Sequence, residues 1–194
     1  MNIYYIAVAV CSLSILTNPS RAENRVDLGS QTLSNIRGSM GINMVAGNNN
    51  QQGNLAAIAV SGPAVIQFNQ QNQSTTHLSG RQSVAISGSA LSHNQGLIGI
   101  NQAAGEANQQ LNAFALSLND DSGMGVVTDI NLSTSVAKTP SGKVPTTTTN
   151  SIYLDDNALM GSNGVIQVNQ VTGQGNQAIN MVSLPLAGVV TVSP

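Results

Sequence analysis

Three segments of the sequence, residues 38–59, 96–117 and 164–185, align with one another without a gap. The positions that coincide are glycines and amides, with aliphatic residues between them. The coincident glycines are Gly38, Gly96 and Gly164, then Gly47, Gly105 and Gly173. The coincident amides are Asn43, Asn101 and Asn169; Asn50, Asn108 and Asn176; Gln51, Gln109 and Gln177; and Asn54, Asn112 and Asn180. An internal repeat of this kind predicts one structural unit per copy, stacked on its neighbours.

Each copy reads as a strand, a turn and a second strand. In the second copy, Ile98 and Ile100 fall on one face of the first strand and Asn101 falls on the other. After the turn, Leu111 and Asn112 begin the same alternation of faces. Because glycines and amides surround the second strand, its Ala and Leu residues favour a strand over a helix.

The turn of each copy begins at the second coincident glycine. It comprises residues 47–50, 105–108 and 173–176 in the three copies. Glycine and asparagine tolerate a positive φ, which a tight reversal of the chain requires.

Amides and a scarcity of charge suit such stacking. Asn and Gln make up 39 of the 194 residues, whereas only 14 residues are charged. A stacked amide can donate to one neighbour and accept from the other, but stacked charges would repel one another. Glu106 is the one charged residue inside the repeats. The predicted fold is therefore all-β, a β-solenoid or cross-β stack of three imperfect strand-turn-strand repeats, with one layer per repeat.

The segments between the repeats differ in length and composition. The predicted organisation is a signal peptide (1–22), an N-terminal segment (23–37), repeat 1 (38–60), linker 1 (61–95), repeat 2 (96–118), linker 2 (119–163), repeat 3 (164–185) and a C-terminal tail (186–194). Both linkers contain alternating stretches, such as residues 83–86 and 125–127. The sequence thus leaves open whether the linkers loop out of the stack or add strands to it.

The beginning of the chain has the features of an export signal. Residues 3–16 form an apolar run of 14, too short to span a bilayer as a helix. The small residues Ser20 and Ala22 follow, which predicts cleavage after Ala22. Cys11, the only cysteine, lies inside this segment, so the mature chain would contain no disulfide.

Neither enzymatic chemistry nor nucleic-acid binding is expected. The six basic residues cannot form the positive surface that nucleic acid requires. His77 and His93 lie in polar linker sequence, which favours solvated side chains over catalytic or ligand roles. The adjacent acidic pairs at 120–121 and 155–156 point to opposite faces of an extended chain and read as turn residues. We therefore predict no catalytic residue, no metal site and no cofactor.

A stack of three layers leaves open strand edges at both ends. Soluble proteins usually protect such edges with charge, proline or a covering segment. Only Arg37 at the first end, and Pro185 and Pro194 at the other, offer any such protection. If the edges stay open, further copies can add to them and form a fibre.

The repeats resemble those of the functional amyloid subunits of Pseudomonas, the Fap family. The shared motif is Gly-aliphatic-Asn-x-Ala-Ala-Gly-x-x-Asn-Gln-Gln-x-Asn, and the third repeat departs from it at Gln167, Thr172 and Ala178. The larger subunits of that family carry a Cys-x-x-Cys near the C-terminus, whereas residues 190–194 read Val-Thr-Val-Ser-Pro. A major subunit and a minor or nucleating subunit therefore both stay open.

The resemblance implies self-assembly into cross-β fibres of the extracellular biofilm matrix. The implied partners are further copies of the chain, related fibre subunits, a periplasmic chaperone and an outer-membrane export pore. The implied location is the cell surface, after export. The alternatives are a β-solenoid surface adhesin that does not polymerise and a polysaccharide-binding protein.

Overall fold

The computed structural model describes residues 23–60, 62–74, 80–118, 126–136 and 149–186, and the backbone alone of residues 8–14. These residues form twelve β-strands and contain no helix. The strands are β1 (Val8–Ser14), β2 (Glu23–Leu28), β3 (Arg37–Ala46), β4 (Gln51–Val60), β5 (Ala64–Ser74), β6 (Arg81–Ile86), β7 (Gln95–Glu106), β8 (Gln109–Leu118), β9 (Val126–Val136), β10 (Thr149–Leu154), β11 (Asn163–Gln174) and β12 (Gln177–Leu186). The predicted all-β fold is confirmed.

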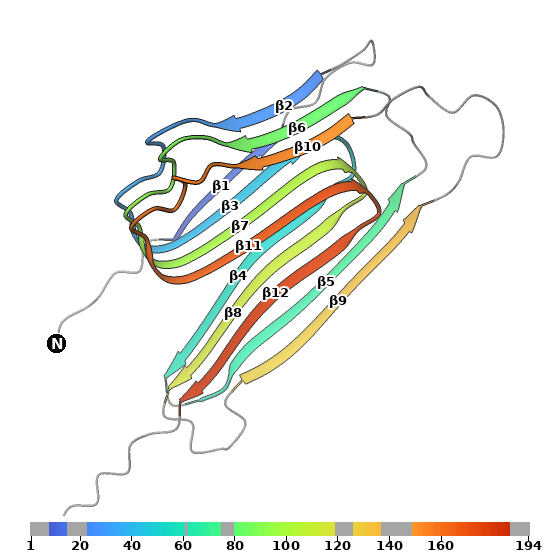
Figure 1. The fold of residues 1–194 in the computed structure, drawn as a ribbon. Helices are drawn as coiled ribbons and strands as arrows, with labels where there is room; N and C mark the ends of the chain where they lie inside the picture. The colour runs from blue at the N-terminus through green and yellow to red at the C-terminus, as the bar shows by residue number, and fades with distance from the viewer. Residues whose placement is uncertain are drawn as a thin grey trace, which may run out of the picture.

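The strands form four parallel sheets (Figure 1). Sheet A has the order β1-β3-β7-β11, sheet B β10-β6-β2, sheet C β12-β8-β4 and sheet D β5-β9. Neighbouring strands come from successive parts of the chain, so sheets A, B and C each take one strand from each of three layers. Layer 1 is β2, β3 and β4; layer 2 is β6, β7 and β8; layer 3 is β10, β11 and β12.

The layers pair in the register that the repeats predict. Gly38, Gly96 and Gly164 are direct partners in sheet A. In sheet C, Gln109 pairs with Gln51 on one side and with Gln177 on the other. A parallel in-register ladder brings each residue next to its equivalents in the neighbouring layers.

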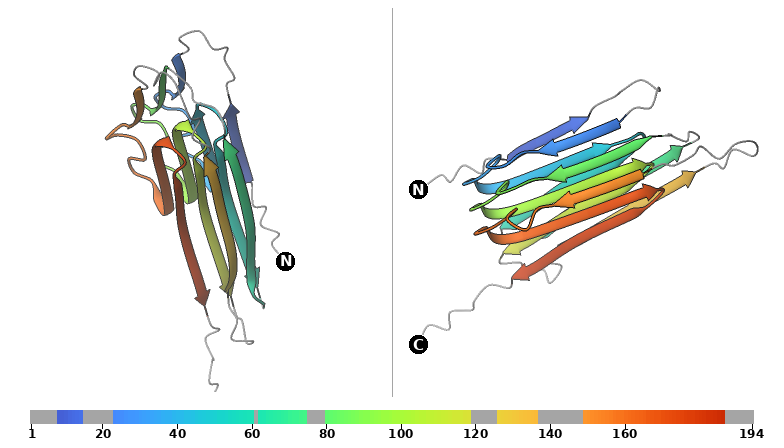
Figure 2. Two further views of the ribbon diagram at one scale, coloured as in Figure 1. Left: turned by 90° about the vertical axis from the view of Figure 1, so that its right-hand side faces the viewer. Right: turned by 45° about the horizontal axis from the view of Figure 1, so that its top comes forward.

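The sheets lie face to face, as the two further views show (Figure 2). Sheet B packs on sheet A through an apolar core that includes Val84, Ile86, Ile98 and Ile100, each at most 1% exposed. Sheet C packs on sheet D through a second apolar core centred on Leu111. Amide side chains fill the space between sheets A and C, so the polar layer lies between two apolar ones.

The segments that the sequence left open as loops or strands contain four strands. In linker 1, β5 joins sheet D and β6 joins sheet B. In linker 2, β9 joins sheet D and β10 joins sheet B. Each layer therefore contains more residues than the sequence repeat, because it also includes a strand of sheet B. A leucine lies five residues before the first glycine of each repeat, and these leucines, Leu33, Leu91 and Leu159, have φ between 55° and 64°. They lie in the turns between sheets B and A and pack against the first core.

Strand β1 lies within the predicted signal peptide and pairs with β3, Val8 opposite Ser39 through Ser14 opposite Val45. In the chain that includes this segment, β1 therefore covers the outer edge of β3. Cleavage after Ala22 stays a prediction. The site itself and the acidic pair at 120–121 lie outside the described residues.

Candidate functional site: glycine and amide columns

Six glycines form two columns that run along the layers at the two ends of the strands of sheet A. All six have φ between 99° and 138°, a region that residues with a side chain rarely adopt. A Cβ added to Gly96 would lie 2.0 Å from the carbonyl oxygen of Gly38, and one added to Gly105 would lie 1.9 Å from that of Gly173. Glycine is therefore required at Gly47, Gly96, Gly105 and Gly164 both for the backbone conformation and for the close approach of neighbouring layers. The six residues are Gly38, Gly96 and Gly164, and Gly47, Gly105 and Gly173.

The amides predicted from the repeats form four hydrogen-bonded columns. In the first, Asn101 Nδ2 donates to Asn43 Oδ1 over 3.0 Å, and Asn169 Nδ2 donates to Asn101 Oδ1 over 3.0 Å. In the second, Asn112 donates to Asn54 over 3.0 Å and Asn180 donates to Asn112 over 3.2 Å. The other columns are Asn50, Asn108 and Asn176, with distances of 2.9 and 3.0 Å, and Gln51, Gln109 and Gln177, with distances of 3.0 and 3.1 Å.

Two of these columns are bonded to each other between sheets A and C. Asn112 Nδ2 donates to Asn101 Oδ1 over 3.1 Å, and to the backbone oxygen of Ile100 over 3.0 Å. Asn169 Nδ2 donates to Asn112 Oδ1 over 3.1 Å. Asn101 and Asn112 are 0% and 1% exposed. Buried amides that are fully bonded in this way fix the register of both sheets, because a slip of one residue would leave them without partners.

Further stacked polar residues were missed in the sequence because they do not recur in all three repeats. Gln52 Nε2 donates to Gln110 Oε1 in the first two layers, but the third repeat has Ala178 at that position. Gln170 Nε2 donates to Gln102 Oε1 over 2.8 Å in the last two layers. A pairwise comparison of the repeats would have found both.

One departure from the repeat motif has a structural reason. Gln167 stands where the other repeats have Gly41 and Gly99. Its side chain is 5% exposed, and Nε2 donates to the backbone oxygen of Ala113 in layer 2 over 2.9 Å. At Gly99 a Cβ would lie 2.5 Å from Asn54 Oδ1, so a side chain fits in layer 3 but not in layer 2.

Among the described residues, no three His, Cys, Asp or Glu side chains gather closely enough to hold a metal ion. His93 is exposed, and His77 lies outside the described part of the chain. Within the same ranges, no helix could span a membrane.

Asp155 is a turn residue that also contacts the neighbouring layer. Its Oδ1 accepts a hydrogen bond from the backbone N–H of Asn157 over 2.9 Å. This bond, and one from the backbone N–H of Gly88 in layer 2, hold the pKa of Asp155 below its usual value of 3.8. The charge of Asp155 in turn raises the pKa of the exposed Tyr153.

Acid should therefore weaken the contact between layers 2 and 3. A lowered pKa in the folded state stabilises the fold above the unfolded pKa, and this stabilisation is lost as the pH falls through the folded pKa. In urea titrations between pH 6 and pH 2, the free energy of unfolding should fall further for the natural chain than for Asp155→Asn. Parallel curves for the two proteins would contradict this role of the carboxylate.

Parallel strands in register, with glycine and amide columns along the direction of stacking, define a β-solenoid of the amyloid type. The chain belongs to the functional amyloid protein FapB/FapC family, whose family model matches residues 11–187. This is a family of structural amyloid proteins, not a known enzyme family. No solved structure matches the chain.

Proposed function

We propose that the chain is exported, loses residues 1–22 and assembles into amyloid fibres of the extracellular biofilm matrix. In such a fibre, layer 1 of each copy would stack on layer 3 of the copy before it, in the same register that relates the layers within one molecule. Membership of the functional amyloid family supports the function. The arrangement of the amide columns supports the mode of stacking.

This mode of stacking is supported by the direction of the hydrogen bonds between the amide side chains of neighbouring layers. In all four columns, the side-chain nitrogen of the later layer donates to the side-chain oxygen of the earlier layer. A column with one direction has different ends, and stacking layer 1 of a new copy on layer 3 brings these unlike ends together. Two like ends would place donors against donors or acceptors against acceptors.

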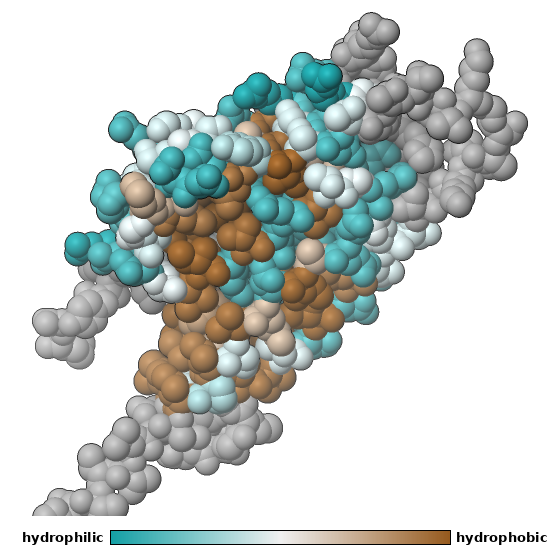
Figure 3. Space-filling model, in the orientation of Figure 1, coloured by the Kyte–Doolittle hydropathy of each residue, from teal (hydrophilic) through white to brown (hydrophobic). Residues whose placement is uncertain are grey.

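The apolar side chains of the middle layer are more deeply buried than their equivalents in the last layer, and stacking of a further copy would reduce this difference. Leu111 and Ala113 of layer 2 are completely buried, whereas their equivalents Ile179 and Met181 of layer 3 are 47% and 49% exposed. Figure 3 shows apolar side chains gathered over β11 and β12. A hollow of about 370 Å³ at this end is lined by residues of both strands, Met181 among them. Covering this surface would supply the hydrophobic part of the assembly energy.

Removal of the signal segment would expose the strand edge at the layer 1 end of the stack. Strand β1 pairs with the edge of β3 that the β11 strand of a preceding copy would need. Cleavage after Ala22 would leave this edge open. The chaperone and the outer-membrane pore that the family resemblance implies would act on the chain before assembly, and related fibre subunits would join it in the fibre.

The test is incubation of purified residues 23–194. Fibres with a reflection near 4.7–4.8 Å along their axis are the expected result. A sample that stays monomeric for days would exclude a subunit that polymerises alone and would favour the surface adhesin. Binding to a panel of glycans by this monomer would favour the polysaccharide-binding alternative.

A further inference from the structure

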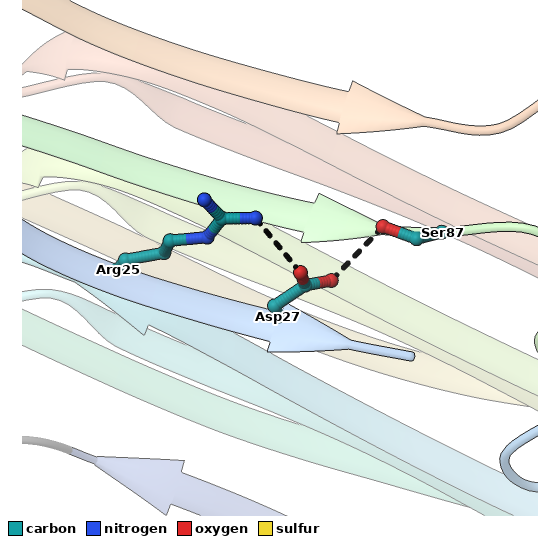
Figure 4. A network of polar contacts seen from close by, with 3 residues as sticks. All are labelled: Arg25, Asp27 and Ser87. Carbon is teal, nitrogen blue, oxygen red and sulfur yellow. Dashed lines mark hydrogen bonds and ion pairs between the residues drawn. The ribbon is translucent and has the colours of Figure 1, made fainter. Parts of the chain in front are cut away.

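The outer face of sheet B carries different side chains in the first and last layers. In layer 1, Arg25 Nη2 donates to Asp27 Oδ2 over 3.0 Å, and Ser87 Oγ of layer 2 donates to Asp27 Oδ1 over 3.0 Å (Figure 4). In layer 3, the Tyr153 hydroxyl donates to Asp155 Oδ2 over 3.3 Å. All of these contacts lie on the side of sheet B that faces away from the core.

The register places these groups in neighbouring columns. Asp27, Ala85 and Tyr153 are partners across the three layers, and Arg25 pairs through Ser83 with Ser151. Within one molecule, layer 2 separates Arg25 from Tyr153 by two strand spacings, about 9.5 Å. On this face Arg25 lies in the first layer, Arg81 in the second and the Tyr153 ring in the last. Within one molecule Arg25 bonds Asp27 of its own layer, whereas stacking of two copies would place Arg25 in the layer next to Tyr153.

We propose that Arg25 of each added copy binds the Tyr153 ring and the Asp155 carboxylate of the copy before it. This inference rests on the proposed function, because it requires layer 1 to stack on layer 3. The side chain of Arg25 already extends along its strand to Asp27, whose column contains Tyr153. Stacking would bring the Arg25 guanidinium one strand spacing, about 4.8 Å, from the Tyr153 column, within the range of about 6 Å of a cation–π contact.

This contact would distinguish the junction between molecules from every junction within one. The amide and glycine columns are nearly alike in all layers, so they stabilise stacking without identifying which layer follows which. Arg25 would also lie between two carboxylates, Asp27 of its own copy and Asp155 of the copy before. The guanidinium would then offset the repulsion between these two charges.

The experiment is a double-mutant cycle on the concentration of monomer that remains beside mature fibres of residues 23–194, which contain β2 to β12. Arg25→Gln and Tyr153→Thr should each raise this concentration about two- to fivefold, the effect of losing one exposed cation–π contact. The double variant should resemble the single ones, because both substitutions remove the same contact. Tyr153→Phe, which keeps the ring, should stay close to the natural chain.

Arg81→Gln is the matched control. Arg81 lies in layer 2, where Glu23 and Thr149 of the same molecule are its partners, so its loss should leave the monomer concentration unchanged. If the effects of Arg25→Gln and Tyr153→Thr multiply in the double variant, or if Arg25→Gln has no effect, the inference is wrong although the fibre remains. If residues 23–194 form no fibre, the proposed function itself fails.

Discussion

Replacing Gly105 by alanine should reduce the free energy of unfolding by about 4 kcal/mol or more, an exceptional value for one substitution. The new Cβ would lie 1.9 Å from the carbonyl oxygen of Gly173 and 2.8 Å from its carbonyl carbon. The φ of 138° at this position is strained for any residue with a side chain. Because the obstructing atoms are backbone, layer 3 can accommodate the methyl group only by moving away from layer 2.

Gly29→Ala is the control, since no atom lies within 4 Å of its added Cβ and its φ lies outside the left-handed region. It should leave the stability close to that of the natural chain. Urea titration followed by far-ultraviolet circular dichroism measures both variants. Equal stability of the two would show that the layers do not approach at Gly105 as described.

Replacing Asn101 by aspartate should destabilise the fold by about 3–5 kcal/mol at neutral pH, the cost of an unpaired buried charge. Asn101 is completely buried, and its Nδ2 donates to Asn43 Oδ1 over 3.0 Å and to the backbone oxygen of Gly53 over 2.8 Å. An ionised carboxylate cannot donate, so it would face these two oxygens and Asn54 Oδ1, which lies 3.2 Å from Asn101 Nδ2. Fibre growth should slow accordingly, and more so when Asn112→Asp is added.

Acid should partly restore the stability and the fibre growth of Asn101→Asp. Burial raises the pKa of the introduced carboxyl above its unfolded value of about 3.9, so the penalty is complete above the raised pKa and smallest below about pH 3.9. Growth rates at pH 7 and pH 3 therefore test the prediction, with the exposed Asn131→Asp of β9 as control. Equal slowing of Asn101→Asp at both pH values would argue against buried, stacked amides.

The sequence predicts sheets A and C well and sheets B and D poorly, for a physical reason. Residues that touch their own equivalents in the next layer are constrained to be alike, so Asn101 and Gly105 recur in every repeat. The strands of sheet B need only alternate, since Val26, Val84 and Ile152 pack on the core while their neighbours face solvent. Alternation of apolar and polar residues does not require the same residues to recur in each layer. A comparison of the sequence with itself therefore does not distinguish strands from loops in the linkers.

The turns between sheets B and A were not predicted from the sequence, for a related reason. Gln31, Leu33 and Asn35 all have positive φ, although leucine and glutamine are not residues that signal this conformation. Asn94 fixes the corresponding turn of layer 2, because its Oδ1 accepts from the backbone N–H of Ile36 and its Nδ2 donates to Leu33. These bonds join residues that are about 60 positions apart, so no local pattern could show them.

Among the described residues, sheet D has two strands, β5 and β9, beside the three layers of the molecule. Strand β5 lies against β4 and β8, and β9 lies against β8 and β12. In a fibre that grows by the proposed stacking, this difference would recur once per molecule. The fibre would then have a long axial period of about 14 Å, three strand spacings, superimposed on the 4.7–4.8 Å period. Each subunit could then be counted along the filament at that interval.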